Sequence, residues 1–230
     1  MSAFNLPARP LIVTIDGPAG AGKTTVSKLL AKKLGYRYLD TGALYRGVAV
    51  AAREAGVSAE DDAALEALCR RLKLDLIPDG DGLRIVLDGT DITSQIRTPE
   101  ISMLASAVSA RPVVRAFLLA TQRDLAARKA VVAEGRDMGT VVFPQAEAKF
   151  FLDADAGIRA QRRYEELNQT TGAAPSLTNV EQEMRQRDRN DSTRAVAPLQ
   201  PAEDAIRIDS SRLSLVQVVD RMLHHIFRIV

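Results

Sequence analysis

The sequence predicts an α/β fold built on a doubly wound, five-stranded parallel sheet that carries two inserted lobes. Five apolar, β-rich runs each end in polar or glycine residues, and helical patterns separate them. Near-continuous apolar runs are typical of parallel strands whose two faces are both covered by helices. The predicted strands are residues 11–16, 36–40, 131–135, 148–153 and 205–210.

The first predicted strand leads directly into "GPAGAGKTT", which fills the pattern G-x-x-x-x-G-K-[ST]. In such a loop the backbone N–H groups line a concavity and the next helix adds its dipole, so the loop captures anions. An ordinary strand-to-helix turn is the alternative reading. The pattern predicts a nucleoside triphosphate, with Lys23 on the outer phosphates and the Thr24 hydroxyl on Mg²⁺. The predicted nucleotide-binding residues are Gly17, Pro18, Ala19, Gly20, Ala21, Gly22, Lys23, Thr24 and Thr25.

Several later positions carry helix-start signals. A Ser or Thr followed three residues later by an acidic residue or Gln is typical of the first turn of a helix. Thr98–Pro99 predicts a further start, because proline is tolerated at the first helical position. The paired signals are Ser58 with Asp61, Thr178 with Glu181 and Ser214 with Gln217.

Two stretches interrupt the alternation of strands and helices. The first, between the second and third strands, is longer than one crossover helix requires. Within it, "LDLIPDGDGLRIVLDGTDIT" alternates around a Gly/Asp turn and predicts an antiparallel hairpin. The second, residues 159–194, is polar and rich in arginine, and "NQTTGAAPS" predicts a loop between two helices. We therefore expect a core sheet with two inserted lobes.

Composition limits the classes of function. The chain has 230 residues, a formal net charge of +2 and 4% aromatic residues, which argues against a nucleic-acid-binding surface. No run approaches the ~18 apolar residues that a membrane span needs. The single cysteine, Cys69, excludes an internal disulfide and a thiolate zinc site. We expect a cytoplasmic monomer without nucleic-acid or membrane partners.

The remaining motifs point to a small kinase. A GTPase would show D-x-x-G and N-K-x-D; the first pattern occurs only at Asp79–Gly82, inside the predicted hairpin turn, and the second is absent. A hydroxyl acceptor needs a carboxylate base, whereas a phosphate monoester is already anionic near neutral pH and needs cations instead. Arginines follow the strand ends and fill the second insertion: Arg46, Arg136, Arg159, Arg162, Arg163, Arg187, Arg189 and Arg194.

The acceptor class stays open at this point. A shikimate or sugar kinase would use the same loop with a hydroxyl-activating carboxylate. A non-catalytic nucleotide-binding module would also carry the loop, because the motif reports phosphate binding and not chemistry. Any single arginine also fits a solvated helix face.

The chain resembles the bacterial cytidylate kinases, members of the nucleoside monophosphate kinase family of P-loop NTPases. The stretches that carry the resemblance are "IDGPAGAGKTT", "YLDTGALYR", "IRTPEIS", "EGRDMGTVVFP", "KFFLDAD" and "RDRNDSTRAVAPL", in this order. The resemblance implies transfer of the γ-phosphoryl group of ATP to CMP or dCMP, with Mg²⁺ and without a general base. It also implies a core sheet of order 2-3-1-4-5, with an enlarged monophosphate lobe and a closing lid.

The resemblance further implies roles for individual residues. The predicted catalytic residues are Lys23, Arg136 and Arg194, with Thr24 as the metal ligand. The residues implied to bind the acceptor phosphate are Arg46, Arg136 and Arg194, with Thr41 beside the acceptor. Those implied to bind cytosine are Ser106, Arg115 and Asp137. Those implied to bind the ribose side are Arg187 and Asp191. From the residues alone, Ser106 also fits a packed helix position and Arg115 a solvated one. The implied division is a core of 1–40, 107–158 and 195–230, a monophosphate-binding insert of 41–106 and a lid of 159–194.

Overall fold

The computed structural model describes residues 9–80, 82–171 and 175–229. The chain folds as two compact units. The first unit comprises Met1–Tyr38, Lys129–Thr193 and Pro198–Val230, and the second comprises Leu39–Arg128 and Arg194–Ala197.

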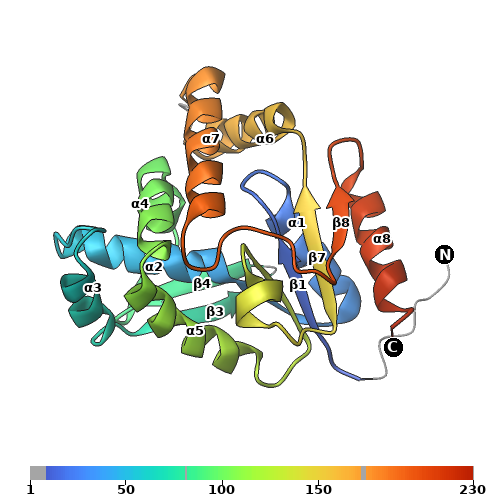
Figure 1. The fold of residues 1–230 in the computed structure, drawn as a ribbon, viewed down its shortest axis with the longest axis horizontal. Helices are drawn as coiled ribbons and strands as arrows, with labels where there is room; N and C mark the ends of the chain where they lie inside the picture. The colour runs from blue at the N-terminus through green and yellow to red at the C-terminus, as the bar shows by residue number, and fades with distance from the viewer. Residues whose placement is uncertain (1–8, 81, 172–174, 230) are drawn as a thin grey trace. The chain divides into compact units, whose positions relative to one another are not determined.

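A five-stranded sheet forms the centre of the first unit (Figure 1). Its strand order is β2-β6-β1-β7-β8, which confirms the predicted order 2-3-1-4-5. The pairings of β1 with β6 and β7 are parallel, and Asp16 at the end of β1 is in register with Gly135 and Phe151. The carboxyl ends of these central strands therefore meet at one edge. The strands are β1 (Ile12–Asp16), β2 (Arg37–Asp40), β6 (Val131–Gly135), β7 (Ala148–Asp153) and β8 (Ile206–Asp209).

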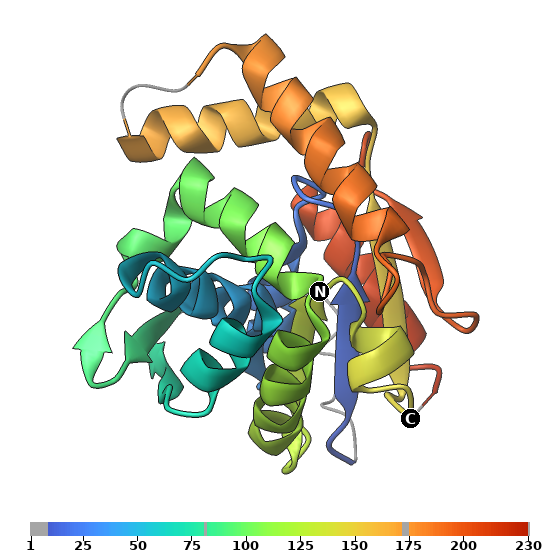
Figure 2. The same cartoon turned by 60° about the vertical axis from the view of Figure 1, so that its left-hand side comes forward.

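Helices complete the first unit. α1 (Lys23–Leu34) and α8 (Leu215–Ile226) contribute buried side chains to one hydrophobic core with the strands. α6 (Ala156–Thr171) and α7 (Leu177–Thr193) pack side by side (Figure 2). A short π-helical turn, η2 (Met138–Val142), follows β6.

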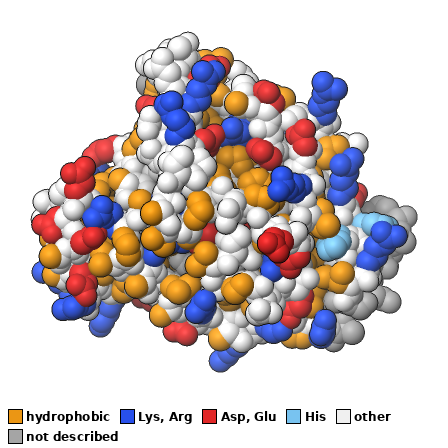
Figure 3. All heavy atoms as spheres, in the orientation of Figure 1, with side chains coloured by type: hydrophobic (Ala, Val, Ile, Leu, Met, Phe, Trp, Pro, Cys, Tyr) orange, Lys and Arg blue, Asp and Glu red, His pale blue; other side chains and the backbone are white. Residues whose placement is uncertain are grey.

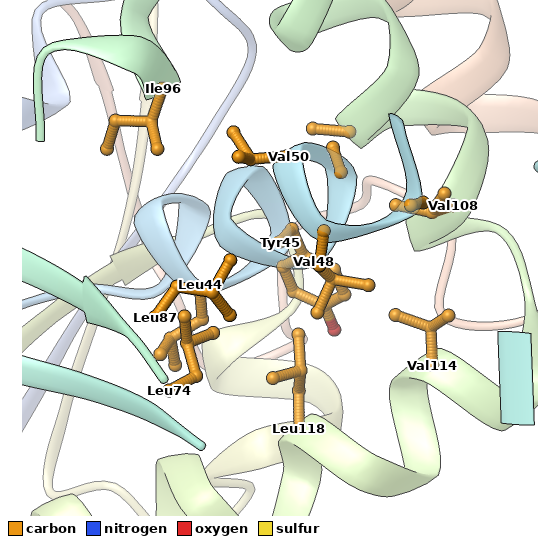
Figure 4. Packing of buried hydrophobic residues seen from close by; sticks show 14 of the residues in the cluster. Leu44, Tyr45, Val48, Val50, Leu74, Leu87, Ile96, Val108, Val114 and Leu118 are labelled. Carbon is orange, nitrogen blue, oxygen red and sulfur yellow. The ribbon is translucent and has the colours of Figure 1, made fainter. Parts of the chain in front are cut away.

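The second unit packs four helices with a small sheet. The predicted hairpin is confirmed: β3 (Leu74–Asp79) pairs antiparallel with β4 (Gly82–Leu87), and β5 (Thr90–Asp91) adds a third strand. The amphipathic helix α2 places Leu44 and Val48 at the centre of the core, where Leu118 also lies (Figure 4). The helical segments are α2 (Thr41–Glu54), α3 (Asp62–Cys69), η1 (Gln95–Arg97), α4 (Pro99–Ser109) and α5 (Pro112–Ala126).

The boundary of the second unit differs from the predicted insert of 41–106. Helix α5 belongs to the second unit, because Val114 and Leu118 are fully buried in the same core as α2. The predicted lid, 159–194, folds mainly with the first unit. There Leu167, Val180 and Met184 form a small cluster against which Ala19 of the glycine-rich loop packs.

Two predicted helix starts are wrong. α3 begins at Asp62, where the Asp61 carboxylate accepts from the Ala64 N–H at 2.9 Å. The Ser58 hydroxyl instead accepts from the nearby Glu60 N–H, before the helix. α7 begins at Leu177 rather than after Thr178, because the Ser176 hydroxyl accepts from Asn179 N–H. A capping side chain fixes a helix start only where the backbone presents the right N–H.

The other start signals are confirmed. Ser214 and Gln217 form a complete capping box on α8, and the Thr98 side chain caps α4. The predicted loop "NQTTGAAPS" is helical in its first part, since α6 continues to Thr171 beyond the buried Leu167. Its residues 172–174 lie outside the described part of the chain.

Charged side chains of both signs are interspersed on the face drawn in Figure 3, in keeping with the small net charge. Among the described helices, no single one is long and apolar enough to cross a membrane. α4 and α5 reach that length and composition only as a pair bent by 97°.

Leu118→Ala is expected to lower the free energy of unfolding by about 2–5 kcal/mol, because it removes a fully buried side chain and leaves a cavity. Urea denaturation followed by circular dichroism measures the change. Val216→Ala on α8, where the side chain is 53% exposed, is the control and should change stability by less than about 0.5 kcal/mol. Equal effects would contradict the placement of α5 in this core.

Candidate active site

The glycine-rich loop connects β1 to α1, the strand-to-helix context that its motif requires. Gly17 has φ +149°, and a Cβ there would lie 1.9 Å from the Leu152 carbonyl oxygen. Only glycine fits this close approach to the neighbouring strand. Gly22 precedes α1 with φ 90°, again in the left-handed region. These backbone conformations are typical of a loop whose N–H groups line an anion site at the start of a helix.

Lys23 is a buried cation at the start of α1. Its side chain is 7% exposed and its Nζ donates to the Pro18 carbonyl oxygen at 2.7 Å, across the loop. Burial and the nearby charge of Arg136 lower the pKa of Lys23 to about 7. A bound triphosphate would favour the charged form, because an opposite charge at close range raises a lysine pKa.

Thr24 and Glu134 supply adjacent oxygen atoms. The Thr24 hydroxyl donates to Glu134 Oε1 at 2.8 Å, and the Tyr38 hydroxyl donates to the same oxygen. Glu134 is buried near the end of β6, beside β1. Sequence reasoning missed it, although a carboxylate inside the apolar run "VVAEG" is a usable signal.

These two groups fit a Mg²⁺ ion. Mg²⁺ in nucleotide sites takes one or two carboxylates together with phosphate oxygens and waters, and it does not need an all-protein cage. The described residues contain no group of three or more His, Cys, Asp or Glu that could hold a metal by themselves. Thr24 and Glu134 are therefore the residues that could hold such an ion at this end of the sheet, together with phosphate oxygens and waters.

Arg136 and Asp191 form an ion pair. Arg136 Nε lies 2.8 Å from Asp191 Oδ2, and the Asp191 side chain is 4% exposed. Burial lowers the pKa of Arg136, but the charge of Asp191 and the hydrogen bond to it outweigh burial, so the pKa is raised. Arg136 therefore stays a cation. The charges of Arg136 and Arg187 both act on Lys23, so these predicted residues share one electrostatic environment.

The other arginines of α6 and α7 differ in environment. Arg159 is buried and donates to the carbonyl oxygens of Ala154 and Ala19 and to Asp188, so it ties the glycine-rich loop to α7. Arg162 donates to Ser210, whose hydroxyl in turn donates to the Ala21 carbonyl of the loop. Sequence reasoning could not separate these arginines from surface residues. Arg163 and Arg189 are held by neighbours on their own helices.

The second unit holds its own group of predicted residues. Arg46 Nη2 lies 2.8 Å from Asp40 Oδ2, and Asp40 also caps α2 by accepting from the Ala43 N–H. The Arg46 Nε is buried and has no hydrogen-bond partner among the described residues. Thr41 is buried at the first position of the same helix.

Ser109, which sequence reasoning missed, connects three predicted residues. Its hydroxyl donates to the Ser106 carbonyl at 2.8 Å and accepts from Arg194 Nη1 at 3.2 Å. Its carbonyl accepts from Arg115, whose guanidinium lies 5.6 Å from the centre of the Tyr45 ring. Arg115 is 7% exposed, which contradicts its reading as a solvated helix arginine.

The fold and this site define a P-loop phosphotransferase: the loop has the sequence and the strand-to-helix context of a phosphate-binding loop, and Arg159 and Arg162 are tied to it within the first unit. The cytidylate kinase family model matches residues 13–228, and the chain belongs to this family.

Relatives support the same family along nearly the whole chain. A cytidylate kinase of Geobacter sp. (strain M21) is 50% identical over 212 residues, covering 92% of this chain and 91% of its own length. One from Vibrio cholerae is 48% identical over 215 residues, covering 94% and 95%. An uncharacterized protein from Eubacterium ventriosum, with TM-score 0.53 and 12% identity over 94% of this chain and 98% of its own, shares the fold.

Lys23→Met is expected to reduce turnover at least about a hundredfold, because the loop motif predicts that the lysine charge acts on the transferred phosphoryl group. The same change should stabilise the nucleotide-free protein. The folded pKa of about 7 lies below the ordinary value of 10.5, so the unfolded chain binds more protons between these values. The lysine therefore destabilises the fold fully below pH 7, and this penalty is relieved as the pH rises toward 10.5.

Urea denaturation at pH 6.5 and pH 9.5 tests this sign. We expect the variant to exceed the wild type by roughly 1–3 kcal/mol at the lower pH and by less at the higher pH. Lys33→Met, on an exposed part of α1, is the control and should alter neither stability nor turnover appreciably. Near-normal turnover of Lys23→Met would contradict the assignment of the phosphate-binding loop.

Proposed function

We propose that this chain transfers the γ-phosphoryl group of ATP to CMP or dCMP and forms ADP with CDP or dCDP. The observation that carries the proposal is the buried Nε of Arg46, a guanidinium donor without a hydrogen-bond partner among the described residues. A buried, unsatisfied donor is costly, and an anionic ligand would satisfy it. Relatives named cytidylate kinase at about half identity favour a nucleotide acceptor over shikimate or a sugar.

On the donor side, the chain binds and orients a triphosphate. The backbone N–H groups of the loop and the Lys23 ammonium neutralise its phosphates, and fixed dipoles do so without reorganisation during the reaction. Thr24 and Glu134 would hold Mg²⁺, which neutralises charge on the β- and γ-phosphate oxygens when bound. Tyr38 fixes the Glu134 carboxylate through its hydroxyl.

On the acceptor side, no proton has to be removed. The second pKa of a phosphate monoester is near 6, so the nucleophilic oxygen is already anionic at neutral pH. Arg46, Arg136 and Arg194 are proposed to hold this phosphate, since the planar guanidinium matches two phosphate oxygens at once. Catalysis then depends on positioning and on charge neutralisation rather than on a general base.

Base recognition is proposed for Asp137, Arg115 and Ser106. Cytosine has an amino donor where uracil has a carbonyl oxygen, so a cytosine site needs an acceptor at that position. The ionised Asp137 carboxylate only accepts, whereas Arg115 only donates and suits the N3 or O2 atoms. Asp191 and Arg187 are proposed for the ribose side. Residues 159–194 as a lid, the monomeric state, the cytoplasmic location and the absence of nucleic-acid or membrane partners stay predictions.

A panel of acceptors tests the reaction. Purified protein with Mg·ATP is incubated with CMP, dCMP, UMP, AMP, GMP, shikimate and gluconate, and ADP release is followed by a coupled assay. We expect CMP and dCMP to be the best substrates. Preferred turnover of shikimate or gluconate would replace the proposal with a hydroxyl-directed kinase. Binding of Mg·ATP without turnover of any acceptor would indicate a non-catalytic module.

Asp137→Asn is expected to lower the CMP/UMP ratio of kcat/KM by roughly tenfold or more, about 1.4 kcal/mol. Uracil O4 against a carboxylate would set two acceptors face to face, and the amide of Asn can turn to donate to O4. Steady-state kinetics with both substrates measures the ratio. Asp124→Asn on the exposed face of α5 is the control. If CMP and UMP slow equally, Asp137 orients Arg136 or the metal instead, and base selection lies with Ser106 and Arg115.

A further inference from the structure

Asp16 has two hydrogen bonds that the phosphate chemistry does not use. It is the last residue of β1, is 3% exposed and stands directly before the glycine-rich loop. Its carboxylate is nevertheless bonded across the sheet, to the segment that follows β6. Oδ1 accepts from the Met138 N–H and Oδ2 from the Gly139 N–H, each at 2.8 Å.

Through these two bonds Asp16, which lies on β1, caps the start of η2. The residue before a helix ordinarily supplies the capping side chain. Asp137 holds that position before η2, yet its side chain makes no capping hydrogen bond. Asp16 satisfies the first N–H groups of η2 in its place. The helix start is therefore fixed by a residue more than a hundred positions away in sequence.

The segment that contains Asp137 is anchored on both sides. Before it, Arg136 is paired with Asp191; after it, the backbone of Met138 and Gly139 is held by Asp16. The segment is also closely packed at Gly139, where a Cβ would lie 3.2 Å from both Thr14 Oγ1 and Lys149 Cδ. The position of Asp137, which is itself 2% exposed, therefore depends on the ion pair of Arg136 and on the two hydrogen bonds of Asp16.

The arrangement is electrostatically costly. Burial raises the pKa of Asp16 to about 6, and the charge of Asp137 adds to this, against the two backbone hydrogen bonds and the charge of Lys23. A neutral side chain could hold one N–H at lower cost, whereas a carboxylate accepts from both at once. Accepting from both the Met138 N–H and the Gly139 N–H therefore requires the Asp16 carboxylate.

We propose that Asp16 is a positioning residue that sets discrimination between cytosine and uracil acceptors through Asp137. The inference rests on the proposed assignment of base recognition to Asp137. Asp16 itself does not touch the acceptor in this scheme. It fixes the backbone at Met138 and Gly139, and thereby the direction in which the Asp137 carboxylate is presented.

Asp16→Asn tests the proposal with almost no change of shape. The amide oxygen can accept from one N–H, but the NH₂ group then faces the other N–H, donor against donor. We expect the CMP/UMP ratio of kcat/KM to fall about fivefold or more, mainly through KM for CMP, while the dissociation constant for Mg·ATP measured by calorimetry changes by less than about twofold. Equal losses with CMP and UMP would overturn the proposal.

A double-mutant cycle with Asp137→Asn shows whether Asp16 acts through Asp137. In the Asp137→Asn background, adding Asp16→Asn should leave the ratio unchanged within about twofold, because the carboxylate to be positioned is already gone. Independent, multiplied effects would contradict the proposal. Asp61→Asn is the matched control: this carboxylate also caps a helix, α3, but is exposed and should leave the ratio intact.

The outcomes separate this inference from the proposed function. If Asp137→Asn lowers the ratio and Asp16→Asn does not, only the inference about Asp16 fails. If Asp137→Asn leaves the ratio unchanged, the proposed role of Asp137 in base recognition is wrong, and the inference about Asp16 is then wrong as well. If the Asp16→Asn variant does not fold, Asp16→Ser is used, because the Ser hydroxyl retains one hydrogen-bond acceptor. The dissociation constants of CMP and UMP for that variant then give the CMP/UMP ratio without turnover.

Discussion

Buried charge at the carboxyl ends of β1 and β6 is the constraint on which the rest of the site depends. Asp16, Lys23 and Glu134 are each less than a tenth exposed, and ionised groups in such surroundings need partners. Each has one: backbone N–H groups for Asp16, a loop carbonyl for Lys23 and two hydroxyls for Glu134. The parallel register makes this possible, since it aligns Asp16 with Gly135 and so brings the segments after the two strands together.

Features set by short stretches of sequence were predictable. The central strands β1, β6 and β7 are buried along most of their length, so they form largely apolar runs that a sequence pattern can report. The predicted bounds of all five strands lie within one residue of the observed ones. The glycine-rich loop was predictable for a similar reason: the left-handed φ values at Gly20 and Gly22 and the close approach at Gly17 exclude a side chain. The capping box of Ser214 and Gln217 likewise lies within one turn of helix.

Features that depend on contacts between residues distant in sequence could not be predicted. The bonds of Thr24 to Glu134 and of Asp16 to Met138 span more than a hundred residues, and no local pattern reports them. From the sequence, Ser109 is an ordinary helix residue. Only the structure shows that Arg115 donates to its carbonyl oxygen and Arg194 to its hydroxyl. The boundary after α5 depends on Leu118 packing with α2, which an amphipathic pattern cannot specify because it names a buried face and not its partner.

Two of the arginines proposed for the acceptor phosphate each form an ion pair within their own unit. Arg46 and Arg136 are each paired with an aspartate, Asp40 and Asp191, at 2.8 Å. Removing a guanidinium from water costs several kcal/mol unless a partner compensates, and these carboxylates compensate within the protein itself. In the proposed function, a phosphate at either arginine would share or replace a carboxylate contact rather than neutralise an isolated charge. Its net affinity is a difference between two strong interactions, so geometry rather than charge alone decides which anion is held.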